Sequence, residues 1–186
     1  GDFREHLAVV RRLGHGGVEV RTADELASVN AMIIPGGEST TIGRLATIYG
    51  LMDPLRERIE RGMPVLGTCA GMIFLASATT GPVQPQLGML DVVVERNAFG
   101  RQVDSFEADL EVSGFEHPLR AVFIRAPWID KVGAEVEVLA TVEDPGGGGA
   151  HPVVVQQDRI LATSFHPELT DDDRLHTMLI ELAEER

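Results

Sequence analysis

Apolar runs and segments of helical periodicity alternate over the first half of the chain. Phe3, Leu7 and Val10 recur at spacings of four and three residues, which predicts an amphipathic helix that ends at Gly14. Three short apolar runs are typical of strands. They are VEV at 18–20, AMII at 31–34 and PVLG at 64–67.

Helical spacing returns after the second and third of these runs. The turn residues Pro35, Gly36 and Gly37 end the run at 31–34, and a proline and a glycine bracket the next predicted helix. The predicted helices are one through Ile42, Leu45 and Tyr49, one from Asp53 as N-cap and Pro54 as first position through Leu55 and Ile59 to Gly62, and one over AGMIFLASA at 70–78.

From residue 90 the pattern changes to strands with little helix between them. The predicted strands lie at 90–96, 104–112, 121–126, 136–142, 152–157 and 159–165. A last helix is predicted at 175–185, where Thr170 and Asp173 resemble a capping box. The glycine-rich stretch at 145–152 is typical of a loop between two strands.

This order of elements favours an α/β fold in a single domain, residues 1–186. Alternating strands and helices predict a mostly parallel central sheet with helices on both faces. The second half adds a strand-rich layer. A chain of 186 residues with 44% hydrophobic residues is long enough to bury one substantial core.

Charge and cysteine content narrow the possible partners. The 29 acidic residues against 16 basic ones give a net charge of −13, which argues against nucleic acid or an anionic membrane as a partner. No apolar run approaches membrane-spanning length. The single cysteine cannot form an internal disulfide, which favours a reducing, cytoplasmic location.

That single cysteine, Cys69, follows a predicted strand and precedes a predicted helix in the segment GTCAG. A strand, a sharp glycine-flanked turn and a helix form the layout of a nucleophile elbow. The turn would present the sulfur at the helix N-terminus, where the dipole favours a thiolate and free amides can hold an oxyanion. A buried structural cysteine remains an equally open interpretation of this segment alone.

The segment SFHPEL at 164–169 offers a base for such a thiol. His166 follows a predicted strand, and Pro167 disfavours helical geometry before it. In an extended segment Glu168 would lie beside His166 and hold its ring, as a nucleophilic cysteine requires. The alternative is a surface histidine and a solvated glutamate at a helix approach.

The other histidines and acids carry no comparable pattern. His6, His15, His117, His151 and His176 lack such a neighbour, and we expect them to be surface or packing residues. No cluster has metal-ligand spacing, so no metal site and no cofactor are predicted.

A third element, PGGEST at 35–40, also follows a buried strand. Gly36 and Gly37 would let a backbone amide turn toward a substrate oxygen, and Glu38 and Ser39 offer polar groups to a ligand. A Gly-Gly turn beside the elbow is a plausible second half of an oxyanion hole.

With these elements the chain resembles the class I glutamine amidotransferases, the Cys-His-Glu glutaminases. Within them it resembles the glutaminase subunits of pyridoxal 5'-phosphate synthase. The segments that carry the resemblance are GGESTT, GTCAG, RNAFGRQVDSFE, FIRAP and SFHPELTDD. The resemblance implies the three-layer fold of that class and hydrolysis of L-glutamine to L-glutamate and ammonia for a synthase subunit.

The resemblance also implies a role for each matching residue. Cys69 would be the nucleophile that forms a glutamyl thioester, His166 the base and then acid, and Glu168 the residue that orients it. The amides of Gly37 and Ala70 would form the oxyanion hole. The implied glutamine-binding residues are Gly37, Glu38, Ser39, Arg96, Ile124 and Arg125. Without the resemblance, Arg96 and Arg125 would be assigned to surface salt bridges.

Two departures and two alternatives remain. The resemblance implies an apolar strand before Gly1, so we expect a vacant strand position in the sheet, and the loop at 145–152 is longer than usual. A different cysteine hydrolase, such as a gamma-glutamyl hydrolase, would share Cys69 and His166 but act on glutamyl peptides. A non-catalytic regulatory subunit would release no glutamate.

Overall fold

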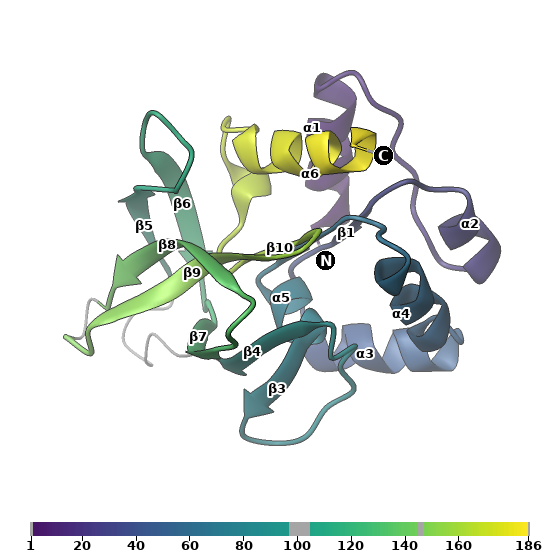
Figure 1. Cartoon of the computed structure of the whole chain (residues 1–186), viewed down its shortest axis with the longest axis horizontal. Helices are drawn as coiled ribbons and strands as arrows, with labels where there is room; N and C mark the ends of the chain where they lie inside the picture. Colours follow the sequence, from purple (N-terminus) through teal and green to yellow (C-terminus); the bar gives the residue numbers. More distant parts are fainter. Residues whose placement is uncertain (1, 97–104, 145–146, 186) are drawn as a thin grey trace.

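Five strands form the central sheet of the computed structural model, which describes residues 2–96, 105–144 and 147–185 (Figure 1). The strand order is β1-β2-β10-β9-β8. Pairing is parallel from β1 through β2 to β10 and antiparallel from β10 through β9 to β8. The strands are β1 (Met32–Ile34), β2 (Val65–Thr68), β10 (Ile160–Thr163), β9 (Ala150–Gln157) and β8 (Glu137–Glu143).

Helices cover both faces of this sheet (Figure 1). Alternating side chains on β2 serve both faces, because Val65 joins the apolar cluster under α3, α4 and α5 while Leu66 joins the cluster that contains α6 residues. The predicted α/β class is confirmed, with parallel pairing confined to β1, β2 and β10 in the described sheet. The helices are α1 (Phe3–Arg12), α2 (Ala23–Ala27), α3 (Ser39–Ile48), α4 (Met52–Glu60), α5 (Ala70–Leu75) and α6 (Arg174–Glu184).

Residues 76–80 and the strand-rich second half build two smaller sheets beside the first. One has the order β3-β4-β7, and the other is an antiparallel pair of β5 and β6. The short 3₁₀ helix η1 follows β10. Their bounds are β3 (Ala76–Thr80), β4 (Leu90–Glu95), β7 (Trp128–Val132), β5 (Ser105–Leu110), β6 (Leu119–Ile124) and η1 (Pro167–Leu169).

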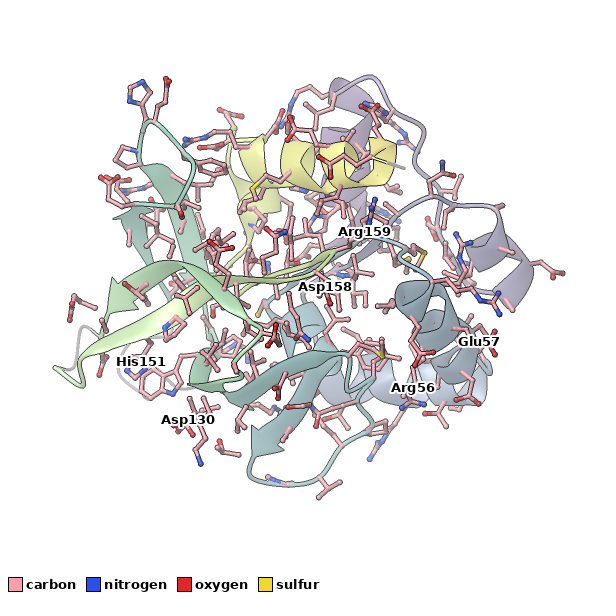
Figure 2. The ribbon with its side chains drawn as sticks, in the orientation of Figure 1. Arg56, Glu57, Asp130, His151, Asp158 and Arg159 are labelled. Atoms are coloured by element: carbon pink, nitrogen blue, oxygen red, sulfur yellow. The ribbon has the colours of Figure 1, made fainter. Side chains whose placement is uncertain are left out.

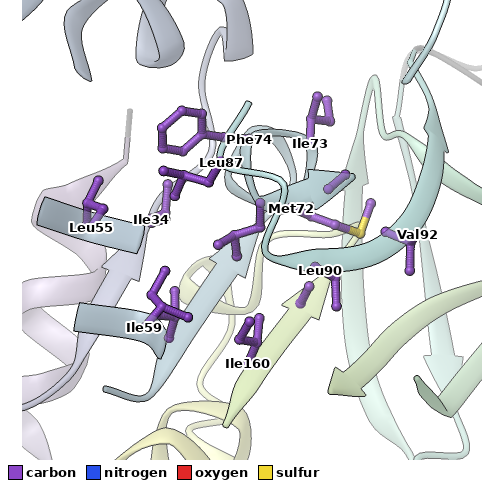
Figure 3. Packing of buried hydrophobic residues seen from close by; sticks show 14 of the residues in the cluster. Ile34, Leu55, Ile59, Met72, Ile73, Phe74, Leu87, Leu90, Val92 and Ile160 are labelled. Atoms are coloured by element: carbon purple, nitrogen blue, oxygen red, sulfur yellow. The ribbon is translucent and has the colours of Figure 1, made fainter. Parts of the chain in front are cut away.

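The core on the α3–α5 side fixes α5 against the sheet (Figure 3). Met72 and Phe74 of α5 are buried, and they pack in the same cluster as Leu55 and Ile59 of α4 and Ile160 of β10. Burying each side chain of this size stabilises the fold by about 2 kcal/mol. The polar periphery lies outside this core: Figure 2 shows the labelled Arg56, Glu57 and Asp130 at the margin of the ribbon.

Two predicted elements differ in the structure, and two observed elements were not predicted. Residues 18–20 form no strand, and Val18 is exposed. The helix predicted at 70–78 ends at Leu75, because Ala76 turns to extended backbone and pairs with Leu90 of β4. Strand β7 and helix α2 were not predicted, although α2 has a true capping box of Thr22 and Glu25.

Two predicted helix starts also differ in detail. The N-cap of α4 is Leu51, so Asp53 and Pro54 lie inside its first turn. Thr170 and Asp173 form no capping box: Thr170 donates its hydroxyl to the carbonyl of Pro167, and Asp173 accepts from Arg12 at 2.9 Å. Arg12 of α1, which binds the Asp173 carboxylate in place of the predicted cap, lies 161 positions away in the chain. A local sequence motif cannot predict a partner at that distance.

Strand β1 is an edge of the described five-stranded sheet, and an apolar cavity of about 1060 Å³ lies against it. Side chains from α1, β1, α3 and α6 line this cavity, among them Phe3, Leu7, Ile33 and Leu179. The strand expected before Gly1 stays a prediction. Within the residues that the structure describes, no helix has the length and hydropathy needed to cross a membrane.

Candidate active site

Cys69 occupies the sharp turn between β2 and α5. Its backbone has φ 49 and ψ −104, a conformation that costs a side-chain-bearing residue roughly 1–3 kcal/mol and clusters at functional sites. Its amide donates to the carbonyl of Thr163 at 2.8 Å, which ties the turn to β10. The predicted strand–Cys69–helix layout is therefore the observed one.

Glycine at position 71 lets this turn close against β1. A Cβ on Gly71 would lie 1.9 Å from the carbonyl oxygen of Ile34, a distance that no side chain can occupy. The close approach brings the first turn of α5, including the amide of Ala70, to the end of β1, where the Pro35–Gly37 turn begins. The two segments predicted to share an oxyanion site are thus neighbours.

His166 lies just beyond β10, and its ring faces Glu168. Nδ1 of His166 is 2.8 Å from Oε1 of Glu168, and both residues are buried. The backbone amide of His166 donates to the carbonyl of Val122 in β6 at 3.0 Å. The pairing of His166 with Glu168 is as predicted, but Glu168 reaches the ring from η1 rather than from an extended segment.

The electrostatics of His166 favour a charged ring. Burial lowers the pKa of His166, but hydrogen bonds with Cys69 and Glu168, together with the charges of both groups, outweigh burial and raise the pKa to about 10. An imidazolium between a thiolate and a carboxylate is the state in which a cysteine is ready to attack a carbonyl.

The Gly36–Gly37 turn packs directly on this ring. A Cβ on Gly36 would lie 2.4 Å from Cε1 of His166, and Gly37 has φ +136, which favours glycine. The turn is therefore shaped around His166.

A polar cluster extends from the same turn. Glu38 caps α3 by accepting from the amides of Thr40 and Thr41, and it also pairs with Arg96 at 3.2 Å. Burial raises the pKa of Glu38, but the hydrogen bonds from Thr41 and Thr40 outweigh burial and lower it to about 2. An ionised Glu38 and the Arg96 guanidinium therefore lie side by side.

Gln84 joins this cluster and was not predicted. Its Oε1 accepts from the hydroxyl of Ser39 at 3.1 Å and from Arg96 at 3.1 Å. Gln84 and Ser39 are buried. The structure thus brings together Glu38, Ser39 and Arg96, which the sequence placed in two separate motifs.

Ile124 and Arg125 lie where β6 ends. Ile124 is 38% exposed, and Arg125 is exposed with φ 42, a strained conformation for a residue with a side chain. Val122, two residues before Ile124, accepts the hydrogen bond from the amide of His166. This end of β6 is therefore adjacent to the His166 segment, while residues 97–104 of the motif RNAFGRQVDSFE lie outside the described residues.

Comparison with known proteins identifies the family of this chain. Over residues 1–185 it matches the model of the SNO glutamine amidotransferase family. The chain belongs to this family.

Individual relatives of this SNO family chain agree with the assignment. "Pyridoxal 5'-phosphate synthase subunit PdxT" of Acidothermus cellulolyticus is 55% identical, over 98% of this chain and 89% of that protein. The protein of the same name from Fervidobacterium nodosum is 49% identical, over 100% of this chain and 94% of its own length.

Solved structures agree as well. One described as "Crystal structure of glutamine amidotransferase" superposes with a TM-score of 0.91 at 54% identity and covers 98% of this chain and 94% of that one. "Structure of PurLQS from Thermotoga maritima" has a TM-score of 0.69 at 16% identity, covering 97% of this chain and 90% of that one, and shares the fold alone.

One group of possible metal ligands occurs among the residues that the structure describes. Ligand atoms of Asp2, His166 and Glu168 all lie within 4.8 Å of one another. Nδ1 of His166 already faces Glu168 at 2.8 Å, so a metal there would compete with the bond that orients the ring. The group is explained by the histidine–carboxylate pair of the SNO family chain, and the absence of a metal site stays a prediction.

The five remaining histidines have three different environments. His15 and His117 are exposed, as expected. His151, which is labelled in Figure 2, stacks on Trp128 with ring centroids 3.8 Å apart. His6 and His176 are buried, and Nε2 of His6 lies 3.4 Å from Oε2 of Glu168. The expectation of a surface or packing role is incomplete for both, because their rings are hydrogen-bonded to one another.

A signal for His6 was present in the sequence. It lies three residues after Phe3 and three before Val9, the other buried residue of α1, so it falls on the apolar face of that helix. A polar residue on an apolar helix face requires a buried partner.

Proposed function

We propose that this SNO family chain hydrolyses L-glutamine to L-glutamate and ammonia and supplies the ammonia to the synthase subunit of pyridoxal 5'-phosphate synthase. The observation that carries the proposal is the 2.8 Å contact between His166 and Glu168 beside Cys69 at the strained elbow. The names of the PdxT relatives supply the partner.

In the proposed reaction the Cys69 thiolate attacks the side-chain amide carbon of glutamine. Amides of Gly37 and Ala70 hold the oxyanion that forms, and the His166 imidazolium gives its proton to the leaving nitrogen. Ammonia leaves, and a glutamyl thioester remains on Cys69. His166 then takes a proton from water, which attacks the thioester and releases glutamate and the thiolate. Glu168 holds the ring throughout.

Substrate recognition is assigned to the polar cluster and to the end of β6. Glutamine carries one ammonium and one carboxylate on its α-carbon. The ionised Glu38 complements the ammonium, and Arg96 and Arg125 complement the carboxylate. Gly37, Ser39 and Ile124 would complete the pocket.

The proposal also includes the domain organisation, the partner subunit and the cellular location of the chain. Residues 1–186 would form one glutaminase domain that works in a hetero-oligomer with the synthase subunit in the cytoplasm. The chemistry needs neither a cofactor nor a metal. A glycine peptide reorients at low steric cost, so the Gly36–Gly37 turn against His166 is suited to switch the site on when the partner binds.

The test measures glutamate release by the full chain with and without a synthase subunit. We expect release to be slow alone and faster with the partner, and Cys69→Ala to remove it, by a factor on the order of a million in comparable triads. Ser113→Ala, at an exposed serine, is the matched control and should leave the rate unchanged. Substantial turnover by folded Cys69→Ala would exclude the proposed nucleophile.

The alternatives give different results in the same assay. Faster cleavage of glutamyl peptides than of glutamine would indicate a gamma-glutamyl hydrolase. No glutamate release even with the synthase subunit present would indicate a non-catalytic regulatory subunit.

A further inference from the structure

Behind Glu168, away from His166, two more histidines form a buried polar chain. His6 belongs to α1 and His176 to α6, the two helices on the same face of the sheet (Figure 1). Nδ1 of His6 is 2.9 Å from Nε2 of His176, and both residues are at most 2% exposed. Nε2 of His6 is 3.2 Å from the hydroxyl of Thr68 and 3.4 Å from Oε2 of Glu168.

Two atoms at the ends of this chain determine where the protons lie. Oε2 of Glu168 and Nδ1 of His176 are buried side-chain atoms with no hydrogen-bond partner within normal limits. Suppose His6 carried its proton on Nδ1 and donated to His176. His176 would then hold a buried, unsatisfied N–H on Nδ1, which is costly, whereas Nε2 of His6 would accept from the Thr68 hydroxyl and could not donate to Glu168.

The opposite tautomers satisfy every N–H. With a proton on Nε2, His176 donates to Nδ1 of His6, and Nε2–H of His6 donates to the Thr68 oxygen at 3.2 Å, while Oε2 of Glu168 lies 3.4 Å from the same nitrogen. Only a lone pair of His176 is left without a partner, which costs less than an unsatisfied N–H. Burial, together with the charges of His176 and His166, lowers the pKa of His6 to about 3, so the ring is neutral and carries a single proton.

We propose that His6, with its tautomer set by His176, donates from Nε2 to Oε2 of Glu168 and so positions this carboxylate for His166. Glu168 is then held at both oxygens, with His166 on Oε1 and His6 on Oε2. His6 is a positioning residue and touches no substrate. The catalytic part of this inference rests on the proposed glutaminase function.

Two polar substitutions separate positioning from packing. The amide nitrogen of His6→Gln can reach the place of Nε2 and donate to Glu168, whereas that of His6→Asn takes the place of Nδ1 and faces His176. Both keep a polar group in the buried site. We expect kcat for glutamine, measured with the synthase subunit, to fall about tenfold or more in His6→Asn, with KM unchanged. His6→Gln should recover most of this loss.

The pH profile distinguishes an effect on Glu168 from a general loss of structure. A carboxylate that has lost one of its two contacts orients the His166 ring less firmly. The kcat/KM profile of His6→Asn should therefore differ in shape from that of the parent, and the profile of His6→Gln should return toward the parent's. Equal kcat and equal profiles for folded Asn and Gln variants would overturn the positioning role.

A measurement without turnover keeps the inference separate from the proposed function. Nitrogen NMR of the full chain labelled with ¹⁵N-histidine reports which ring nitrogen of His6 and His176 is protonated. We expect Nε2–H in both, and Nδ1–H on His6 would overturn the inference even if the chain hydrolyses glutamine. Nε2–H on both rings in a chain that releases no glutamate would instead refute the glutaminase proposal and leave the contact standing.

Discussion

A single methyl group at Gly36 would press on the ring of His166. The Cβ of Gly36→Ala would lie 2.4 Å from Cε1, 3.0 Å from Nδ1 and 3.4 Å from Nε2 of that ring. Carbon atoms pack at about 3.5–4.0 Å, so the ring or the turn must move by roughly 1 Å. The φ angle of Gly36 lies outside the left-handed region, so the cost of alanine arises from this contact and not from its backbone.

The ring cannot move without breaking its own contacts. Its Nδ1 is hydrogen-bonded to Oε1 of Glu168 at 2.8 Å, and the backbone amide of His166 donates to the carbonyl of Val122 at 3.0 Å. A misplacement of about 1 Å can cost a factor of about 100 in rate. Overpacking a buried contact costs about 1–3 kcal/mol of stability, so Gly36→Ala should still fold.

The assay compares kcat for glutamine hydrolysis, measured with the synthase subunit, with the free energy of unfolding in urea. Gly16→Ala is the matched control, because a Cβ at Gly16 meets nothing within 4 Å and its φ also lies outside the left-handed region. We expect Gly16→Ala to behave like the parent and Gly36→Ala to lose about 100-fold in kcat. A folded Gly36→Ala chain at the parent rate would refute the packing of the turn on His166.

Two further predictions concern charge. Glu168→Gln should keep glutamine binding, seen as an unchanged KM, and lower kcat because an amide stabilises the imidazolium less than a carboxylate does; a parent-like kcat would make Glu168 merely structural. Acid should destabilise the fold: burial lowers the pKa of His6 to about 3 and of His176 to about 4, whereas both have the ordinary value of 6.5 when unfolded. The unfolded chain therefore binds more protons below pH 6.5, and each histidine should cost about 2 kcal/mol of stability at pH 5 relative to pH 7. Urea titrations at both pH values measure this loss, and equal midpoints would contradict the neutral buried pair.

Features that depend on neighbouring residues followed from the sequence. The strand, the turn at Cys69 and the helix after it lie within one short segment, and glycine spacing with apolar runs was enough to predict them. His166 and Glu168 are only two positions apart, so the predicted contact between them forms although the backbone there is a 3₁₀ turn and not an extended segment. Wrong local predictions, such as a helix continuing through Ala76, arose where a distant strand offered a better hydrogen-bond partner.

The alternation of elements, the α/β class and the residue types of the site follow from local sequence, because they depend on side-chain periodicity and backbone preference over a few neighbours. Which of those residues meet depends on how the helices and strands pack together. Gly36 touches a ring 130 positions later, because parallel pairing of β1, β2 and β10 brings their ends to one edge of the sheet. His6 is hydrogen-bonded to a partner 170 positions away, because α1 and α6 lie on the same face of that sheet. No local pattern encodes such a distance, since it results from the packing of whole helices and strands on both faces.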